Sequence, residues 1–281
     1  MSSSGRPGPP PAPDPLPIPV VDNHTHLDMA RDGDEAPDLA AVIEAATAVG
    51  VPRMVQIGCD LDGARFTVEV IDRYAALLGG VALHPNEAPR LNESGQLASA
   101  RAEIERLAAH PRVRVIGETG LDYFRTGTEG VAAQQDSFRW HIDLAKRTGK
   151  TLQIHDRDAH QDVLRILDEE GAPERTVLHC FSGDITMARH CVERGYFLSF
   201  AGTVTFKNAT GLRNALAVTP TENLLVETDA PYLTPAPHRG ATNAPYLIPL
   251  TVRAMAAVLS TDVPTLCTAL TANSELLYGP W

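Results

Sequence analysis

The sequence has only four cysteines in 281 residues, and none of them forms a Cys-x-x-Cys pair. They are widely spaced, at Cys59, Cys180, Cys191 and Cys267. Widely spaced thiols in a chain of this size exclude the dense disulfide framework of a small secreted domain and are typical of a reducing compartment. We therefore expect the cysteines to be reduced and the protein to be cytoplasmic.

Long hydrophobic runs are also missing. No apolar stretch approaches the roughly 18–20 residues that a helix needs to cross a bilayer. The N-terminal residues lack the charged segment followed by an apolar segment that forms a secretory signal peptide. Both features agree with a cytoplasmic location and predict no association with a membrane.

Positive charge is scarce as well. The chain has 24 Lys and Arg residues against 35 Asp and Glu residues, and its formal net charge is −11. A protein that grips nucleic acid along many phosphates needs a broad basic surface, so this function class is disfavoured. A nuclease that holds a strand end at a metal site stays compatible with the charge.

Proline, by contrast, is dense at the start of the chain, at positions 7, 9, 10, 11, 13, 15 and 17. Prolines at this density favour extended backbone and cannot continue a helix or a central strand. We predict a disordered tail over residues 1–18 and a single barrel domain over residues 19–281. The length of the second segment is ordinary for one α/β barrel.

Strands and helices are predicted to alternate from about Ile18 onward. Near-continuous apolar runs predict strands at 18–21, 54–57, 80–83, 113–117, 151–154, 176–178, 196–199 and 224–227. Segments with a helical period lie at 39–49, 64–76, 99–109, 132–147, 161–170, 185–194, 211–218, 249–259 and 264–272. Eight strands in this alternation predict an α/β fold, a closed (β/α)8 TIM-type barrel, with an open doubly wound sheet as the alternative.

Six side chains with metal-ligand chemistry lie just after these apolar runs: His24, His26, Glu118, His155, His179 and Asp229. Strands of a parallel barrel bring their C-terminal ends to one rim, so residues far apart in sequence converge there. His24 and His26 are two residues apart, and in an extended segment both imidazoles point to one side. Each histidine alone is more often a hydrogen-bonded core residue, but the joint pattern predicts a metal site.

Four imidazoles and two carboxylates are enough to hold two divalent cations about 3.5–4 Å apart, the spacing found in binuclear hydrolases. Mixed nitrogen and oxygen ligands permit magnesium, manganese or zinc, and also iron or nickel. Such a pair lowers the pKa of a shared water and stabilises charge on a phosphoryl group. The pattern therefore predicts a hydrolase with two divalent metal cations as cofactors.

Five ordered motifs carry a family resemblance. They are DNHTHLD at 22–28, GETGLDY at 117–123, IHDRDA at 154–159, HCFSG at 179–183 and ETDAPYL at 227–233. In these motifs the sequence resembles the TatD family of metal-dependent deoxyribonucleases, which belongs to the amidohydrolase-like (β/α)8 barrels. The resemblance runs from about Pro19 to the C-terminus.

The resemblance implies a division of the six residues between two metals. His24, His26 and Asp229 would bind one metal, and His155 and His179 would bind the second. Glu118 would bridge the two. The family usually has a His-Pro-His element after its third strand, whereas this chain reads His84-Pro85-Asn86, so its substrate contacts depart from the family pattern.

Catalysis and substrate positioning are predicted at the same rim. Asp229 is expected to act as general base toward the attacking water, and Glu118 to fix the metal spacing. Groups suited to position a phosphate follow the predicted strands: His84, Arg157, Ser182, Lys207 and Asn208. For Lys207 and Asn208 a solvated loop is an equal alternative, and Arg157 has neighbouring aspartates with which it could pair instead.

The leading functional expectation is a metal-dependent deoxyribonuclease of the exonuclease type, with DNA single strands or strand ends as its partner. The same site would serve an ester or amide hydrolase, such as a D-aminoacyl-tRNA deacylase, because that reaction also needs an activated water. A non-enzymatic scaffold is disfavoured, since a scaffold has no need to gather ligand side chains at strand ends. No obligate protein partner is evident.

Overall fold

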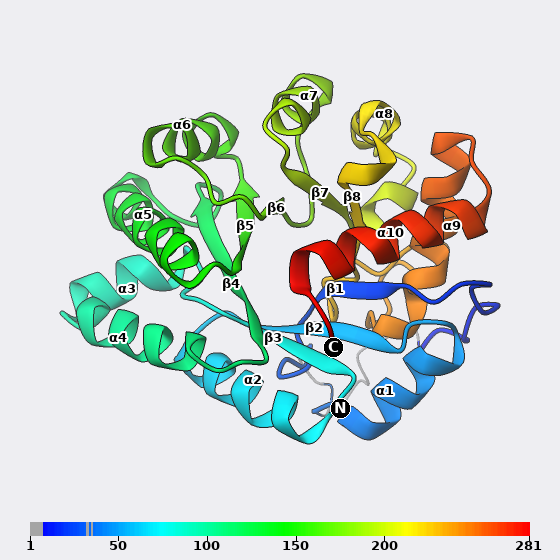
Figure 1. Cartoon of the computed structure of the whole chain (residues 1–281), viewed down its shortest axis with the longest axis horizontal. Helices are drawn as coiled ribbons and strands as arrows, with labels where there is room; N and C mark the ends of the chain where they lie inside the picture. The colour runs from blue at the N-terminus through cyan, green and yellow to red at the C-terminus, as the bar shows by residue number, and fades with distance from the viewer. Residues whose placement is uncertain (1–7, 32–33, 35) are drawn as a thin grey trace, which may run out of the picture.

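A computed structural model of the chain describes residues 8–31, 34 and 36–281. Its centre is one parallel sheet of eight strands in which each strand pairs with the next along the chain (Figure 1). The strands are β1 (Val21–Thr25), β2 (Arg53–Gly58), β3 (Leu77–Val81), β4 (Val113–Asp122), β5 (Thr151–Arg157), β6 (Thr176–Leu178), β7 (Phe197–Phe200) and β8 (Leu224–Val226). Because neighbours in the sheet are always consecutive in the sequence, the strand order confirms the predicted barrel and not the doubly wound sheet.

The ring of strands closes between β1 and the segment that follows β8. The Asp229 N–H donates to the His24 carbonyl oxygen at 3.0 Å, and the His26 N–H donates to the Ala230 carbonyl oxygen at 2.9 Å. The first and last predicted site segments are therefore hydrogen-bonded to each other, although about 200 residues of chain separate them.

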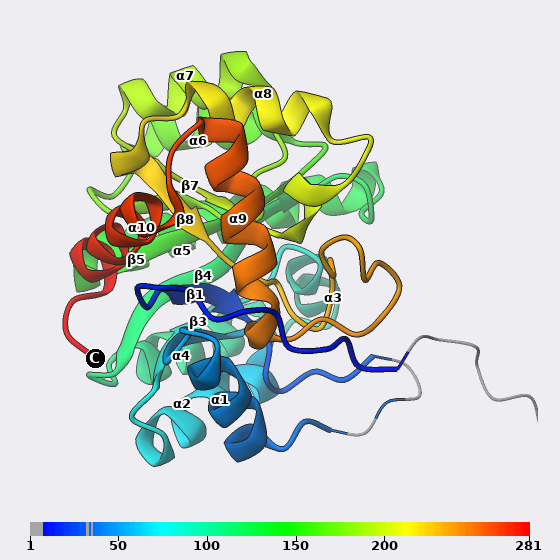
Figure 2. The ribbon, with the colours of Figure 1, turned by 90° about the vertical axis from the view of Figure 1, so that its right-hand side faces the viewer.

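Helices surround the ring (Figures 1 and 2). They are α1 (Leu39–Ala48), α2 (Leu61–Arg73), α3 (Glu87–Glu93), α4 (Leu97–Ala108), α5 (Val131–Thr148), α6 (His160–Glu170), α7 (Ile185–Glu193), α8 (Thr210–Val218), α9 (Ile248–Leu259) and α10 (Val263–Tyr278). Short 3-10 turns lie at η1 (Thr128–Gly130), η2 (Gly202–Thr205), η3 (Thr221–Asn223) and η4 (Pro245–Leu247). Within the described residues, no single helix is long and apolar enough to span a membrane, and Pro245–Leu259 with Val263–Tyr278 meets that test only as a pair bent by 110°.

Local sequence sets several helix ends. Aspartate side chains accept hydrogen bonds from the first N–H groups of α1, α2, α7 and α10, at Asp38, Asp60, Asp184 and Asp262. Gly149 ends α5 in the left-handed region with φ 63°, which glycine adopts without a steric penalty. These caps place the helix boundaries close to those predicted from the sequence.

Alternate strand residues belong to two buried clusters. One contains Val55, Ile57, Leu78, Val115, Val177 and Leu225 together with Leu277 and Tyr278 of α10. The other joins residues such as Met54, Ile116 and Leu152 to the surrounding helices. The Thr151 hydroxyl, at the start of β5, donates to the Leu277 carbonyl oxygen at 2.7 Å. The end of α10 therefore closes the N-terminal end of the barrel and leaves the C-terminal rim to the site.

Several strand boundaries differ from the prediction. β1 lies three residues later than predicted, and β4 and β5 extend past the apolar runs. Consequently His24, Glu118 and His155 lie within strands and not after them. The physical reason is that polar side chains on the barrel interior interrupt the apolar pattern while the backbone ladder continues. The sequence also missed α3, and it ended α10 six residues early.

The predicted disordered tail needs a correction over residues 8–18. These residues form no helix or strand, as their prolines predict, but they lie against the barrel near α9 (Figure 2). Leu16 is buried, and its N–H donates to the Val49 carbonyl oxygen at 3.0 Å. Arg253 of α9 donates to the carbonyl oxygen of Asp14 at 2.7 Å. Disorder is therefore wrong for residues 8–18, and for residues 1–7 the prediction lies outside the described residues.

Candidate metal centre

Hydrogen bonds at Nδ1 orient His24, in β1, and His26, just after it, so that both Nε2 atoms face the same point. His24 Nδ1 lies 2.8 Å from Gln153 Oε1, and His26 Nδ1 lies 2.9 Å from the carbonyl oxygen of Ile57. In each case the partner accepts, so Nδ1 carries a proton and Nε2 is the atom left to bind a cation in place of any proton of its own. The two Nε2 atoms lie 3.2 Å apart and face one point. This is the arrangement expected of a ligand pair.

Glu118 lies at the middle of the cluster and is 5% exposed. Its Oε2 lies 2.5 Å from His179 Nε2, 3.4 Å from His155 Nδ1 and 3.8 Å from His24 Nε2. Its other oxygen, Oε1, accepts from the thiol of Cys59 at 3.2 Å. One carboxylate thus reaches histidines from three different strands or strand ends, as a bridging ligand would.

His155 and His179 are each anchored by a second carboxylate. His179 Nδ1 lies 3.2 Å from Glu227 Oε1, and His155 Nε2 lies 3.4 Å from Asp122 Oδ2. The His179 ring also stacks on the His24 ring, with their centroids 3.9 Å apart. These contacts fix the orientation of both rings toward Glu118.

Asp229 approaches the cluster from the turn after β8. Its Oδ1 lies 3.3 Å from His26 Nε2 and 3.9 Å from His24 Nε2. The residue has φ 55°, a left-handed conformation that costs energy in a non-glycine residue and marks functional turns. Its side chain is 16% exposed, more than those of the two histidines that it contacts. Asp229 is therefore accessible to solvent on the open side of the cluster at the C-terminal rim, which we call the mouth.

The structure brings all six predicted residues together and adds two more, His84 and Glu227. Candidate cation positions, with ligand atoms within 4.8 Å of one another, are formed by His24, His26 and Glu118, and by His84, Glu118 and His155. A third group is His24, His179 and Glu227. His84 was predicted as a substrate contact, yet its Nε2 lies 3.6 Å from Glu118 Oε1. Its role as a substrate contact stays a prediction, and its position makes it a candidate metal ligand as well.

The donor set fits divalent cations. Three buried polar atoms in this cluster lack a hydrogen-bond partner among the described residues: Glu118 Oε2, His155 Nε2 and Glu227 Oε2. Glu118 Oε2 and His155 Nε2 lie within ion-pair distance of His179 and Asp122, respectively, without forming a hydrogen bond. Buried polar atoms without partners are rare in folded proteins, and imidazole and carboxylate groups gathered in this way are typical metal ligands.

The electrostatics of the cluster also favour a cation. Burial lowers the pKa of His26, but Asp229 and Glu118 outweigh it and raise that pKa to about 10. Burial likewise lowers the pKa of His155, but Asp122 and Glu118 raise it to about 9. Burial raises the pKa of Glu118, but the charges of His179 and His84 hold it well below its ordinary value. Protons on the imidazoles thus balance buried carboxylates, and a metal ion would compete with these protons.

The remaining predicted residues lie around the mouth. The Arg157 guanidinium packs over the ring of Phe124 at 3.8 Å from its centroid, and among the described residues it forms no ion pair with Asp156 or Asp158. The Ser182 hydroxyl donates to the Asp156 carbonyl oxygen at 3.2 Å. Lys207 and Asn208 are exposed, and within the described part of the chain neither side chain makes a hydrogen bond or ion pair. Their role in substrate binding stays a prediction.

Four residues of the site had no role in the sequence-based prediction: Cys59, Asp122, Gln153 and Glu227. A signal existed for two of them. Asp122 is four residues after Glu118, on the same face of an extended strand, and Glu227 is two residues before Asp229. For Gln153 and Cys59 no local signal exists, because their partners come from other strands.

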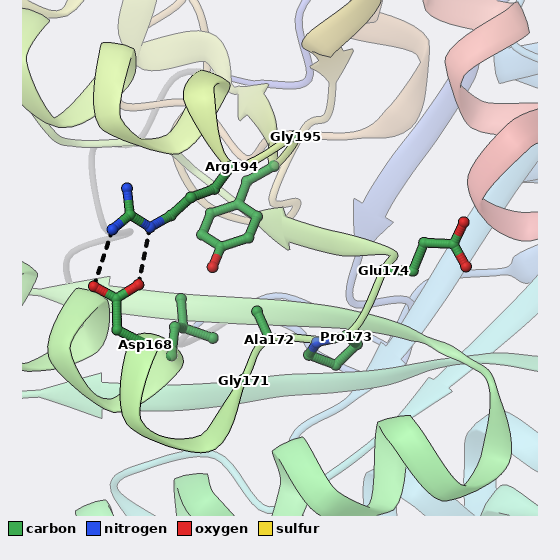
Figure 3. Close-up of a pocket in the computed structure, with 9 residues that line it drawn as sticks. Asp168, Gly171, Ala172, Pro173, Glu174, Arg194 and Gly195 are labelled. Atoms are coloured by element: carbon green, nitrogen blue, oxygen red, sulfur yellow. Dashed lines mark hydrogen bonds and ion pairs between the residues drawn. The ribbon is translucent and has the colours of Figure 1, made fainter.

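A separate hollow lies at the opposite face of the barrel (Figure 3). Its volume is about 460 Å³, and it lies between the end of α6, the start of β6 and the start of β7. Asp168 accepts from Arg194 across it at 2.9 and 3.1 Å. This hollow lies at the N-terminal face, whereas the active sites of such barrels lie at the C-terminal face. None of the residues of the metal-ligand cluster lines it.

A (β/α)8 barrel with histidines and carboxylates clustered at its C-terminal rim defines the class of metal-dependent barrel hydrolases. Residues 21–279 match a family described as TatD related DNase. Over 266 residues, 92% of this chain and 98% of the relative, the chain is 48% identical to a metal-dependent hydrolase TatD of Mycobacterium tuberculosis. Over 260 residues, 92% of this chain and 98% of the relative, it is 36% identical to the metal-dependent hydrolase YabD of Bacillus subtilis.

Solved structures agree on the fold. The crystal structure of YjjV, a TatD homologue from Escherichia coli, superposes with a TM-score of 0.85 at 23% identity, covering 93% of this chain and 98% of that one. The chain belongs to the TatD family of metal-dependent hydrolases.

Proposed function

We propose that the protein is a deoxyribonuclease that hydrolyses phosphodiester bonds of DNA with the help of two divalent cations. The observation that supports this most directly is the position of Glu118 between two sets of imidazoles, His24 with His26 and His84 with His155. Two cations that share one carboxylate form the centre used for in-line displacement at phosphorus. The family description, TatD related DNase, supports the same bond class.

The cation positions would be held by His24, His26, Glu118 and Asp229 on one side, and by Glu118, His155, His179 and His84 on the other. Bound cations would lower the pKa of a water and neutralise charge on the phosphoryl oxygens. Magnesium, manganese and zinc are all compatible with a mixed nitrogen and oxygen donor set, and the imidazole-rich composition favours zinc.

The chain's own residues prepare the reaction. Asp229 is the proposed general base: its carboxylate is accessible at the mouth and accepts the proton of the attacking water. Gln153, Glu227 and the Ile57 carbonyl oxygen orient the histidines, so that no reorganisation is needed when a substrate binds. Arg157, two residues after His155, supplies a cation that can face a phosphate oxygen.

The proposal is tested by substituting the proposed general base, Asp229. Asp229→Asn should lower the rate of metal-dependent hydrolysis of a single-stranded oligonucleotide by about 10²- to 10⁴-fold, the range typical of general base catalysis. Asp158→Asn, which changes an exposed aspartate with φ 56° after β5, is the matched control and should keep wild-type activity. Oligonucleotide, D-aminoacyl-tRNA and simple ester substrates are compared with and without chelator. Chelator-sensitive cleavage of only the latter two would replace the proposal with an ester hydrolase.

A further inference from the structure

Large exposed hydrophobic side chains are few in this protein, and two of them flank the mouth. Among the described residues they are Phe124, 62% exposed, Tyr232, 46% exposed, and Leu276, 63% exposed. Phe124 lies two residues after the end of β4, and Tyr232 lies three residues after Asp229. Leu276 lies on α10, at the other end of the barrel. Aromatic rings exposed to water at a predicted active site carry an unfavourable hydration free energy. A ligand that covers these rings would bind more tightly because it removes this surface from water.

Contacts with Arg157 of β5 fix the position of Phe124. The Arg157 guanidinium covers one face of the ring at 3.8 Å from its centroid. The Tyr123 N–H donates to the Arg157 carbonyl oxygen at 2.9 Å, which ties the loop after β4 to β5. With one face covered and 62% of the residue exposed, the ring has its opposite face available to solvent.

A second arginine–aromatic contact joins the loops after β8 and β7, where the Arg239 guanidinium packs over the Phe206 ring at 4.0 Å from its centroid. Tyr232 is fixed by its backbone, because its N–H donates to the Asp229 carbonyl oxygen at 2.9 Å and its own carbonyl oxygen accepts from Asn243 at 2.6 Å. In the ring order β1 to β8, β4 and β8 are four strands apart, so Phe124 and Tyr232 follow strands on opposite sides of the ring.

We propose that Phe124 and Tyr232 are base-stacking positions that hold an unpaired DNA strand across the metal centre, one on each side of the bond to be cut. This inference rests on the proposed function and adds to it the two side chains that hold the bases of the strand. Bases stack on aromatic rings without regard to sequence, and an adjacent arginine adds a cation–π contribution.

Two further properties of the chain agree with this assignment. With a formal net charge of −11, the protein has few cations with which to hold phosphates, so base stacking supplies contact that charge does not. A base within a duplex is already stacked on its neighbours, so exposed rings select single strands or frayed ends.

The experiment separates base contacts from chemistry. The kcat and KM of wild-type protein, Phe124→Ala and Tyr232→Ala are measured with the working metal on an oligothymidylate, on a strand of the same length with abasic sites, and on a small chromogenic phosphodiester. Leu276→Ala is the matched control, an exposed apolar side chain away from the mouth. Phe124→Trp tests rescue by another aromatic ring.

Each ring removed should raise KM for the oligothymidylate by about 5- to 100-fold, the factor that corresponds to stacking of one base. The same variants should equal wild type on the abasic strand and the small phosphodiester, Phe124→Trp should keep a low KM, and Leu276→Ala should change nothing. Variants that match Leu276→Ala on the oligothymidylate would overturn the inference and leave the nuclease function standing. Equal losses on all three substrates would also overturn it, because the rings would then be structural.

Failure of the proposed function gives a different pattern, in which wild-type protein cleaves no phosphodiester with any metal. The stacking inference is then decided by fluorescence anisotropy with wild-type protein. Tighter binding of the oligothymidylate than of the abasic strand, lost in Phe124→Ala and Tyr232→Ala, supports it. Equal binding of the two strands refutes it.

Discussion

The two sides of the metal cluster are built differently. On the side that we call the inner half, His24 and His26 have side chains that are 0% and 3% exposed. On the outer half, His84 and His155 are 15% and 20% exposed. The inner rings are held by uncharged acceptors, Gln153 and a backbone carbonyl, whereas His155 is held by the carboxylate of Asp122.

The two halves should therefore hold a cation differently. A cation in the inner half would meet two buried, preoriented imidazoles and exchange slowly. A cation in the outer half would meet more exposed imidazoles, so its occupancy should depend more on metal concentration.

Removing one ligand from each half should distinguish them most strongly. His26→Ala should lower activity by about 10²- to 10³-fold, because several kcal/mol of charge stabilisation are lost, and added metal should not restore it. His155→Ala should lose activity at low metal concentration and regain part of it at high concentration. Metal content by mass spectrometry and activity across a metal titration measure both. Identical titration curves for the two variants would show that the halves do not differ.

The groups that orient the histidines should show the same contrast more weakly. Gln153→Leu removes the acceptor of His24 Nδ1 and should lower metal affinity by about 10- to 100-fold. Asp122→Asn keeps an acceptor near His155 and should cost less. Isothermal titration with the working metal gives both affinities, and thermal unfolding of the apo forms checks that both variants fold. A larger loss for Asp122→Asn would reverse the proposed order.

His141 is buried next to the outer half, where it contacts the backbone beside His84. From its burial we predict a pH dependence of the free energy of unfolding. Burial lowers the pKa of His141 to about 3, and its Nε2 accepts from the Leu83 N–H at 3.1 Å, next to His84. The unfolded chain, with a histidine pKa of about 6.5, binds more protons than the folded chain between these values. Stability should therefore fall as the pH drops from about 6.5 toward 3, and His141→Gln should make this fall shallower.

Thermal unfolding of metal-free protein at several pH values measures that slope. The control is His238→Gln, in the loop after β8, where the histidine side chain makes no hydrogen bond within the described residues. Parallel curves for His141→Gln and wild type would contradict the assignment of the slope to His141.

The smallest effect is expected away from both halves. Lys207 is exposed and unpaired within the described residues, so Lys207→Ala should raise KM for an oligonucleotide by no more than about fivefold, the limit for one screened surface charge. Arg157→Ala, which removes the cation under Phe124, should raise KM more. Kinetics at two salt concentrations compare them. A larger effect for Lys207→Ala would move the phosphate path to the β7 side of the mouth.

Much of this site was predictable, because each ligand directly follows or continues an apolar run. His179 and Asp229 lie just past the strand ends, as predicted. His24, Glu118 and His155 were found by the same rule although they lie inside strands, since the inward polar side chain interrupts the apolar pattern at that point. The packing of residues 8–18 was not predictable, because proline density reports the lack of helix or strand and not the lack of contacts.

The barrel and the six ligand-type residues follow from local periodicity, which can be read along the chain without the fold. The partners of these ligands come from the folded ring: Gln153 for His24, Glu227 for His179, Asp122 for His155, and the approach of His84 to Glu118. These contacts depend on strand register and on the closure between β1 and Ala230, which relate residues 30 to 200 positions apart. Local sequence carries no record of register between strands, so the partner of each ligand is decided only in the folded sheet.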